Sequence, residues 1–360
     1  MKINKILTLF TCLSILGLSS CSSNDDNSTD LIEIVIDGAT VTPNLGGANE
    51  PNQVYVDLST NTTTEIARDS WDLGFSSGTE FRVVLNGSIY MATAALSATD
   101  IDAVTEDNTE VLTLQEQVAV GTYAAENIAF VDAPNGDLSG TAIAEVTEDN
   151  NNVYLLNLGF GLSNESAATG SVAVTGESRG WKKIKITKSG NDYVLQYADL
   201  NATTHQEITI SKNSDYNFTF FSFNTETVVD VEPKKSEWDL NFTVFTNEIQ
   251  GYGSYGYTDF VANNLKADAK AYLINNEEAT LTYDTFTLDD VNSTLFENDQ
   301  RNIGSSWRNG GGPSSLPSLK DSVFYIVQDA NGNYYKLKFL ALTNESGVRG
   351  YPEFVYSLLQ

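Results

Sequence analysis

Hydrophobic and polar residues alternate most clearly in two short segments that read almost alike, Trp71-Asp72-Leu73-Gly74-Phe75 and Trp238-Asp239-Leu240-Asn241-Phe242. In a β-strand the Trp, Leu and Phe of each segment fall on one face, and the Asp and the variable residue fall on the other. A β-prone run precedes each segment, residues 54–58 and residues 218–223. Both segments are therefore predicted to be core strands. The two tryptophans are 167 residues apart, longer than a solenoid period, which predicts a duplicated domain.

Two β-hairpins are predicted at corresponding places in the two halves, residues 181–200 and residues 322–342. Tyr193 and Tyr335 are equivalent in these hairpins and are 142 residues apart. The first copy therefore carries about 25 more residues between its Trp strand and its hairpin than the second copy does.

The remaining pattern favours strands and turns over helices, because Tyr, Phe, Thr and Val are abundant. We predict an all-β fold of two related antiparallel β domains, residues 31–212 and residues 213–360. Shorter strands are predicted at residues 31–36, 80–85 and 350–358. Turns are predicted at Asn86-Gly87, as a two-residue hairpin turn, and at residues 133–137. A short helix is predicted to begin within residues 91–98, helical or strand fragments are predicted within residues 100–117, and a sparse helical signal lies at residues 288–295.

The N-terminal segment has the features of a secretory signal. Residues 1–5 are basic and residues 6–18 are mainly apolar, a run shorter than the ~20 residues that span a bilayer. Leu18-Ser19-Ser20-Cys21 resembles a bacterial lipobox, which predicts a signal peptide at residues 1–20 and a lipid on Cys21. The alternative is cleavage near Ser20 and a soluble secreted protein.

An acidic, polar segment follows at residues 21–30 and is predicted to be a disordered tether. It also resembles the signal with which Bacteroidetes lipoproteins reach the outer face of the outer membrane. Because Cys12 lies in the predicted signal peptide, Cys21 is the only cysteine of the mature chain, and an internal disulfide is excluded.

The net charge of −28, from 20 basic and 48 acidic residues, suits a soluble surface protein. It argues against charge-driven binding to nucleic acid or to an anionic bilayer. The roughly 340 residues of the mature chain exceed what one core usually organises, which again favours two domains.

These motifs together resemble the HmuY family of Bacteroidetes surface lipoproteins. The resemblance lies in the Trp238 motif with Thr246-Asn247 behind it, in the loop at residues 252–260, and in the terminal segments 331–339 and 350–354. It covers residues 213–360 well, and a weaker copy covers residues 54–210. The resemblance implies an all-β fold and a protein that captures haem, held between two axial His or Met side chains, for a TonB-dependent outer-membrane receptor.

The chain departs from that implied iron site. Haem iron takes His, Met, Cys or Tyr as axial donors, and the mature chain has one His and one Met, His205 and Met91, both in the first copy. The stretch that matches the family's ligand loop, residues 307–314, contains neither. Met91 and His205 are the candidate haem ligands; the alternatives are a core-filling Met and a solvated strand-edge His.

A Gly- and Tyr-rich loop at residues 250–260 is a second candidate site, through Tyr252, Tyr255 and Tyr257. Their rings could present a binding surface, or a phenolate could ligate haem iron; the alternative is a β corner whose rings pack on the sheet. Residues 329–333 have alternating oxygen donors but lack the Gly and Glu of a calcium loop, so we predict a hairpin turn there.

No catalytic motif is evident, because the chain has one His and no G-x-S-x-G sequence, and 48 acidic residues make carboxylate pairs uninformative. The leading hypothesis is a non-enzymatic outer-membrane surface lipoprotein that captures haem. The competing hypothesis is a binding or scaffold module of the same fold without haem, for carbohydrate or a surface protein partner.

Overall fold

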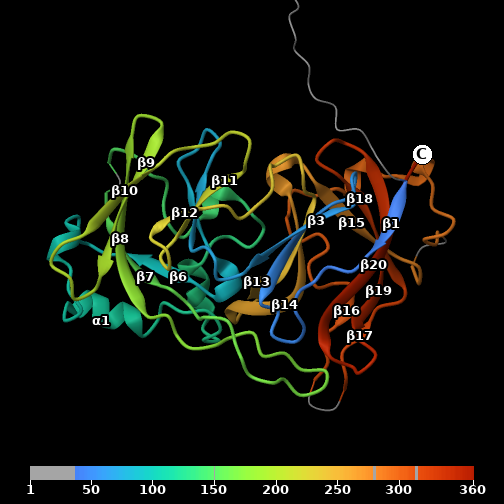
Figure 1. Ribbon diagram of the computed structural model, residues 1–360, viewed down its shortest axis with the longest axis horizontal. Helices are drawn as coiled ribbons and strands as arrows, with labels where there is room; N and C mark the ends of the chain where they lie inside the picture. Colours follow the sequence, from blue (N-terminus) through green and yellow to red (C-terminus); the bar gives the residue numbers. More distant parts are fainter. Residues whose placement is uncertain (1–36, 150, 279–280, 313–314) are drawn as a thin grey trace, which may run out of the picture. The chain divides into compact units, whose positions relative to one another are not determined.

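Two β-sandwiches make up residues 37–360 of the computed structural model, which describes this range except for residues 150, 279–280 and 313–314 (Figure 1). The protein is mainly β, and its strands pair antiparallel, as predicted. No helix in the part of the chain that the structure describes is long and apolar enough to cross a membrane.

The first sandwich packs a four-stranded sheet on a five-stranded sheet. Their facing side chains form one buried core that includes Leu73, Phe75 and Phe221 from one sheet and Tyr193 and Leu195 from the other. The strand order of the four-stranded sheet is β12 (Thr227–Val229), β11 (Phe218–Ser222), β4 (Leu73–Ser76), β5 (Val83–Leu85). The strand order of the five-stranded sheet is β10 (Gln206–Ile210), β9 (Asp192–Asp199), β8 (Trp181–Ser189), β7 (Val153–Asn157), β6 (Ala92–Ala95).

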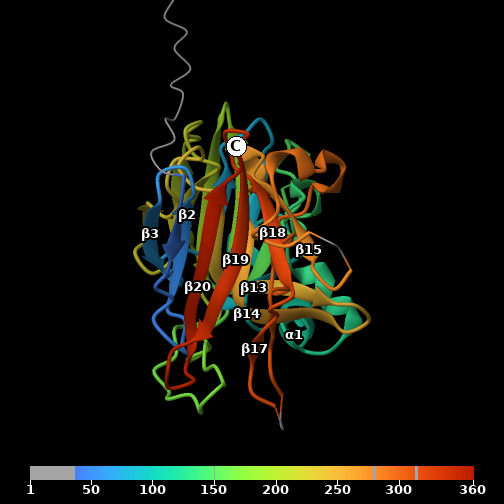
Figure 2. The ribbon, with the colours of Figure 1, turned by 90° about the vertical axis from the view of Figure 1, so that its right-hand side faces the viewer.

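The second sandwich has the same arrangement. Val56, Phe242 and Val261 of its four-stranded sheet pack on side chains such as Tyr335 and Phe354 of its five-stranded sheet, whose strands β18, β19 and β20 run side by side in Figure 2. The strand order of the four-stranded sheet is β14 (Gly253–Asn263), β13 (Leu240–Ile249), β2 (Asn52–Asp57), β3 (Thr62–Ala67). The strand order of the five-stranded sheet is β1 (Gly38–Val41), β20 (Arg349–Leu358), β19 (Tyr334–Thr343), β18 (Val323–Gln328), β15 (Lys270–Asn275).

Short helical connections cover part of the outer face of each five-stranded sheet. Val111 of a helix packs with Leu155 of β7 in the first sandwich, and Phe286 packs with Phe324 of β18 in the second. Part of the outer face of each five-stranded sheet is therefore buried as well. The connections contain α1 (Thr109–Gln115), η2 (Ile101–Ala103), η3 (Ala125–Phe130), η4 (Leu138–Gly140), η6 (Leu288–Asp290) and η7 (Ser293–Leu295). Two further short helices, η1 (Gly87–Ile89) and η5 (Leu265–Ala267), come after the first and second Trp motifs. The short strand β16 (Arg308–Asn309) pairs with β17 (Ser318–Leu319).

The two halves of the sequence exchange a hairpin. The hairpin β2–β3 precedes the first Trp motif but pairs with β13 of the second, and β11–β12 precedes the second motif but pairs with β4 of the first. The first sandwich is thus formed by one continuous segment from β4 to β12, inserted between β3 and β13. The predicted domains 31–212 and 213–360 differ from this, since the strand that precedes each motif completes the sheet of the other copy.

The two Trp motifs occupy equivalent places in this exchanged arrangement. The Asp72 N–H donates to the carbonyl of Phe221, and the Asp239 N–H donates to that of Val56, both at 2.8 Å. The ring of Trp71 packs edge-on against Phe220 with centroids 4.8 Å apart, and the ring of Trp238 packs in the same way against Tyr55 at 4.9 Å. These matching contacts support the predicted internal duplication.

The predicted faces of the Trp motifs were wrong in one respect. Leu73 and Phe75 lie in the core of the first sandwich, whereas Trp71 belongs to a separate cluster with Trp238. The reason is that β4 begins at Leu73, so the alternation of a strand does not extend back to the tryptophan. Asp72, expected on the outer face, is fully buried and accepts the Phe223 N–H at 2.6 Å.

Several local predictions are resolved by the pairing of the strands. The hairpins β8–β9 and β18–β19 and the closing strand β20 are confirmed, as is the turn at residues 329–333. The Asn86-Gly87 hairpin turn was wrong, because Asn86 caps η1 and β5 pairs with β4 instead of β6. The helix start at 91–98 was also wrong, since β6 is a strand there; residues 253–260, predicted as a loop, belong to β14. The predicted strand at 31–36 lies outside the described residues.

Five charged side chains are buried together beside the second sandwich; we call them the buried charge cluster. Arg349 and Arg308 both lie against the Asp259 carboxylate, with 3.0 Å from Arg349 Nε and 3.5 Å from Arg308 Nε to its Oδ2. The Asp259 N–H donates to the Glu50 carboxylate, and Arg68 donates to the Glu50 carbonyl. Burial and the neighbouring Asp259 raise the pKa of Glu50 well above its usual value. The cluster ties together segments that are far apart in the sequence.

Asn86 and Asn264 make matching hydrogen bonds behind the two Trp motifs, so substitutions there test whether the two positions are equivalent. The Asn86 amide donates to the carbonyls of Arg68 and Trp71 at 2.7 and 2.8 Å, and the Asn264 amide donates to those of Lys235 and Trp238 at 2.9 and 2.8 Å. Both side chains are buried. We expect Asn86→Ala and Asn264→Ala each to lower the free energy of unfolding by about 1–3 kcal/mol, because each leaves buried carbonyls without donors.

Urea denaturation measures this effect, with exposed Asn44→Ala, which loses a single side-chain donation to Glu65, as the matched control. If only one of the two buried variants is destabilised, the two positions are not equivalent.

Candidate functional site

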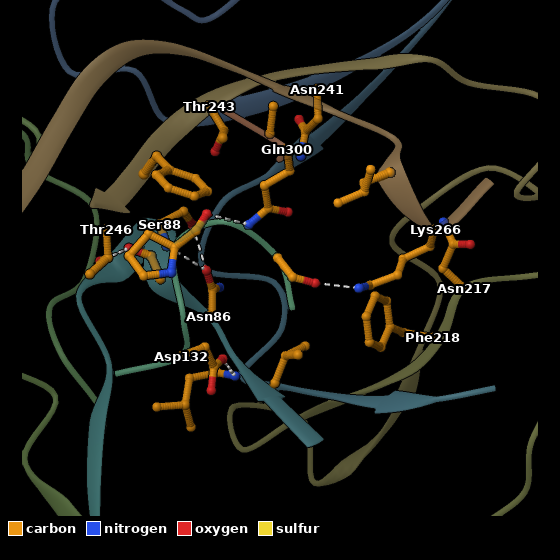
Figure 3. A pocket seen from close by; sticks show the side chains of 18 of the residues that line it. Asn86, Ser88, Asp132, Asn217, Phe218, Asn241, Thr243, Thr246, Lys266 and Gln300 are labelled. Atoms are coloured by element: carbon orange, nitrogen blue, oxygen red, sulfur yellow. Dashed lines mark hydrogen bonds between the residues drawn. The ribbon is translucent and has the colours of Figure 1, made fainter. Parts of the chain in front are cut away.

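A cavity of about 210 Å³ lies where the two sandwiches meet, beside the Trp cluster (Figure 3). Asn241 and Thr243 of β13 line one side of it, and Phe218 of β11 and Asp132 line another. The exchange of hairpins places these elements together, since β11 belongs to the first sandwich and β13 to the second. Residues from both sequence halves therefore form one site.

A loop at residues 131–141 provides much of the remaining wall; we call it the 131–141 loop. The side chain of Gln300 donates to the Pro134 carbonyl at 3.0 Å, its backbone N–H donates to the Asn135 carbonyl at 3.1 Å, and Lys266 donates to the Gly136 carbonyl. Gly136 has a φ of +83°, and a Cβ there would lie 2.9 Å from the Gln300 side chain. The turn predicted at 133–137 is confirmed by the Gly136 N–H bond to the Ala133 carbonyl.

Aromatic rings form an apolar part of the cavity wall. Trp71, Trp238, Tyr55 and Phe220 pack as one buried cluster beside Phe218. Among the described residues, neither indole N–H of this cluster has a hydrogen-bond partner. The edge-on ring contacts of these indoles are of the kind in which an N–H can face a π cloud, a weak substitute for a hydrogen bond.

Two carboxyl groups at the cavity hold their protons more tightly than usual. Burial raises the pKa of Glu232 to about 7, although its carboxylate accepts the Phe218 N–H at 2.9 Å. Burial likewise raises the pKa of Asp132 to about 6, against the opposing effect of bonds from the N–H groups of Leu85 and Ala142. Lys266 is exposed at the rim, where it contributes the opposite charge.

Met91 and His205, the candidate haem ligands, lie apart. Met91 is 1% exposed, belongs to the first core and touches the cavity. His205 lies beside Asp102, with 2.9 Å from its Nδ1 to the carboxylate, and does not line the cavity. They precede β6 and β10, the opposite edges of a five-stranded sheet. Four strand spacings amount to roughly 19 Å, so the two side chains do not fit as axial ligands of one iron.

The stretch that matches the family's ligand loop is also unsuited to iron. Trp307 is buried, and its ring stacks on Phe339 with centroids 4.1 Å apart. No group of three or more His, Cys, Asp or Glu side chains among the described residues is arranged to hold a metal ion.

The three candidate tyrosines lie on the β13–β14 hairpin, away from the cavity lining. Tyr252 is 58% exposed at the turn, while Tyr255 and Tyr257 are half-buried, with ring centroids 5.8 Å apart. Tyr123, which the sequence did not single out, lies against Tyr255 at 5.7 Å. These rings form a surface separate from the cavity.

Sequence reasoning missed most of the cavity residues. Glu232, Gln300 and Lys266 are isolated polar residues that no motif marks, and Asn241 is the variable position of the second Trp motif. The local signals near the site were the two Trp motifs, Asn86-Gly87, the turn at residues 133–137 and the β-prone run at residues 218–223, and none of them marked it as a cavity.

Comparison with known proteins agrees with this fold class. A family model described as HmuY protein matches residues 49–356, whereas no curated protein sequence matches the chain. Similar solved structures include the apo HmuY analog TFO of Tannerella forsythia, which is 12% identical over 90% of this chain and 96% of that chain with a TM-score of 0.24. Apo PinO from Porphyromonas gingivitis is 11% identical over 90% and 98% with a TM-score of 0.24. A HmuY_like protein from Bacteroides vulgatus is 17% identical over 39% and 83% with a TM-score of 0.20.

These structural similarities are low, so the assignment rests on the sequence match, which spans most of the chain. The chain belongs to the HmuY family of ligand-binding proteins.

Proposed function

We propose that this protein is a surface lipoprotein that binds a small ligand in the cavity between its two sandwiches. The observation that carries the proposal is that this cavity is walled by aromatic rings and by isolated polar side chains from both halves. Concave sites of this kind, mostly apolar with a few polar groups, are where proteins bind small molecules. The protein is proposed to bind, and not to transform, its ligand, as its family does.

Haem held by paired axial ligands is the less favoured function. The Bacteroides vulgatus relative is described as heme binding, and Met91 touches the cavity. The separation of Met91 from His205, and the lack of His and Met in residues 307–314, both oppose the paired ligation that the family resemblance implied.

A haem titration followed by absorbance separates the two functions. We expect Met91→Ala and His205→Ala to leave any haem spectrum unchanged, because the two side chains lie at opposite edges of one sheet. A shifted Soret band that both substitutions weaken would restore the haem hypothesis, and with it delivery to a TonB-dependent receptor.

Occupation of the cavity is measured through the indole N–H signals of Trp71 and Trp238 in ¹⁵N NMR spectra, assigned by Trp→Phe variants. Ring-sized compounds of four classes are titrated: neutral sugars, ammonium ions, carboxylates and uncharged apolar rings. We expect one class to shift both signals saturably in the native protein. Ala262→Phe should abolish the shift, because Ala262 pairs with Asn241 and shares its face toward the cavity.

The control for an added phenyl ring is Ala103→Phe at an exposed position. If no class shifts the indole signals, the cavity is not a ligand site and the proposal fails.

Anchoring by lipid is tested separately. Labelling of cells with an alkyne fatty acid should mark the native chain and not Cys21→Ser, and external protease should cleave the native protein on intact cells. Labelling of the serine variant would contradict the proposed anchor at Cys21.

A further inference from the structure

The polar groups at the cavity combine both charge signs in a small space. Glu232 and Asp132 contribute carboxyl groups, and Lys266 contributes an ammonium group at the rim. A singly charged ligand would be attracted by one of these and repelled by the other.

Amide groups supply the uncharged contacts. Asn241 and Gln300 point toward the cavity in Figure 3. Among the described residues, Asn241 Oδ1 is buried without a hydrogen-bond partner. The side chain of Gln300 bonds to the 131–141 loop through its Nε2. An amide offers both a donor and an acceptor. A ligand hydroxyl, which also donates and accepts, is the group that such amides can satisfy.

The apolar wall and the volume restrict the ligand further. Phe218 presents an aromatic ring on the side opposite Asn241, so the ligand needs an apolar face as well as hydroxyl groups. The volume of the cavity is about 210 Å³. This is below the ~300 Å³ at which pockets for drug-sized ligands begin.

We propose that the ligand of this cavity is one neutral, hydroxylated six-membered ring of monosaccharide size. This rests on the proposed function and names its ligand class. The aromatic ring covers one face of the sugar, and the amides of Asn241 and Gln300 bond its hydroxyl groups. The buried carboxyl groups, held by backbone N–H groups, accept hydroxyl protons at the other side.

The test titrates glucose, galactose, mannose, fucose and N-acetylglucosamine into the full chain, with calorimetry and the indole signals as readouts. We expect at least one sugar to bind and Asn241→Ala to weaken it at least tenfold, with Gln206→Ala on exposed β10 as the control. Cyclohexanol should bind at least tenfold more weakly than the sugar, because a site built for hydroxyl groups leaves its own polar groups unpaired with such an analogue.

The remaining outcomes each overturn a different statement. If tetramethylammonium, benzoate or cyclohexane derivatives shift the indole signals and no sugar does, the ligand class is wrong and the proposed function stands. If a sugar binds equally well to Asn241→Ala and Ala262→Phe, the sugar site is elsewhere on the protein. If no compound of any class shifts the signals, the proposed function fails together with this inference.

Discussion

Replacement of Asp259 by Ala is expected to lower the free energy of unfolding by about 3–5 kcal/mol. Asp259 is 1% exposed, and its carboxylate is the counter-ion of Arg349, which is 5% exposed, and of Arg308. Without it, two guanidinium groups stay buried in the charge cluster and lose the carboxylate that lies against both of them. Removing one partner of a buried ion pair is costly because the remaining charge has lost its water and gained nothing in return.

Urea denaturation followed by tryptophan fluorescence measures this loss. Asp199→Ala is the matched control, since it also removes an aspartate from an ion pair, with Lys182 at 2.7 Å, but the Asp199 side chain is 70% exposed. Exposed pairs contribute about 0–1 kcal/mol. Equal losses in the two variants would show that burial does not set the strength of the Asp259 contacts.

Glu232→Gln is expected to remove part of the pH dependence of stability. The folded protein raises the pKa of Glu232 to about 7 through burial, whereas the unfolded chain has the ordinary value near 4.3. The folded state therefore binds the proton more tightly, and stability falls as pH rises from about 4.3 to about 7. At ~1.4 kcal/mol for each pKa unit, the ionised side chain costs the folded protein at most about 4 kcal/mol above pH 7.

The native protein and Glu232→Gln should thus be equally stable near pH 4, and the variant should be the more stable near pH 8. Chemical denaturation at a series of pH values measures the difference. Glu237→Gln, at an exposed position in the same loop, should follow the native curve throughout. A variant that is less stable than the native protein at pH 8 would mean that Glu232 is held ionised in the folded state.

Both of these residues show why buried charged groups were harder to predict than the fold. Glu232 and Asp259 are two of 48 acidic residues, and in the sequence nothing distinguishes them from the solvated ones. Their pKa values and their energies depend on burial, and burial depends on strands brought together from distant parts of the chain. Met91 and His205 were predicted as haem ligands because they are the single Met and the single His of the predicted mature chain. Their residue types do not show whether the two side chains lie near each other.

The sequence by itself determined the class of fold, the two equivalent Trp motifs, the two hairpins and the family, because alternation and turn residues act over a few neighbours. The tertiary structure alone decided that β2–β3 and β11–β12 change places, since any strand with an apolar face can complete either sheet locally. It also decided where the cavity lies, because that space exists only between surfaces that the exchange brings together.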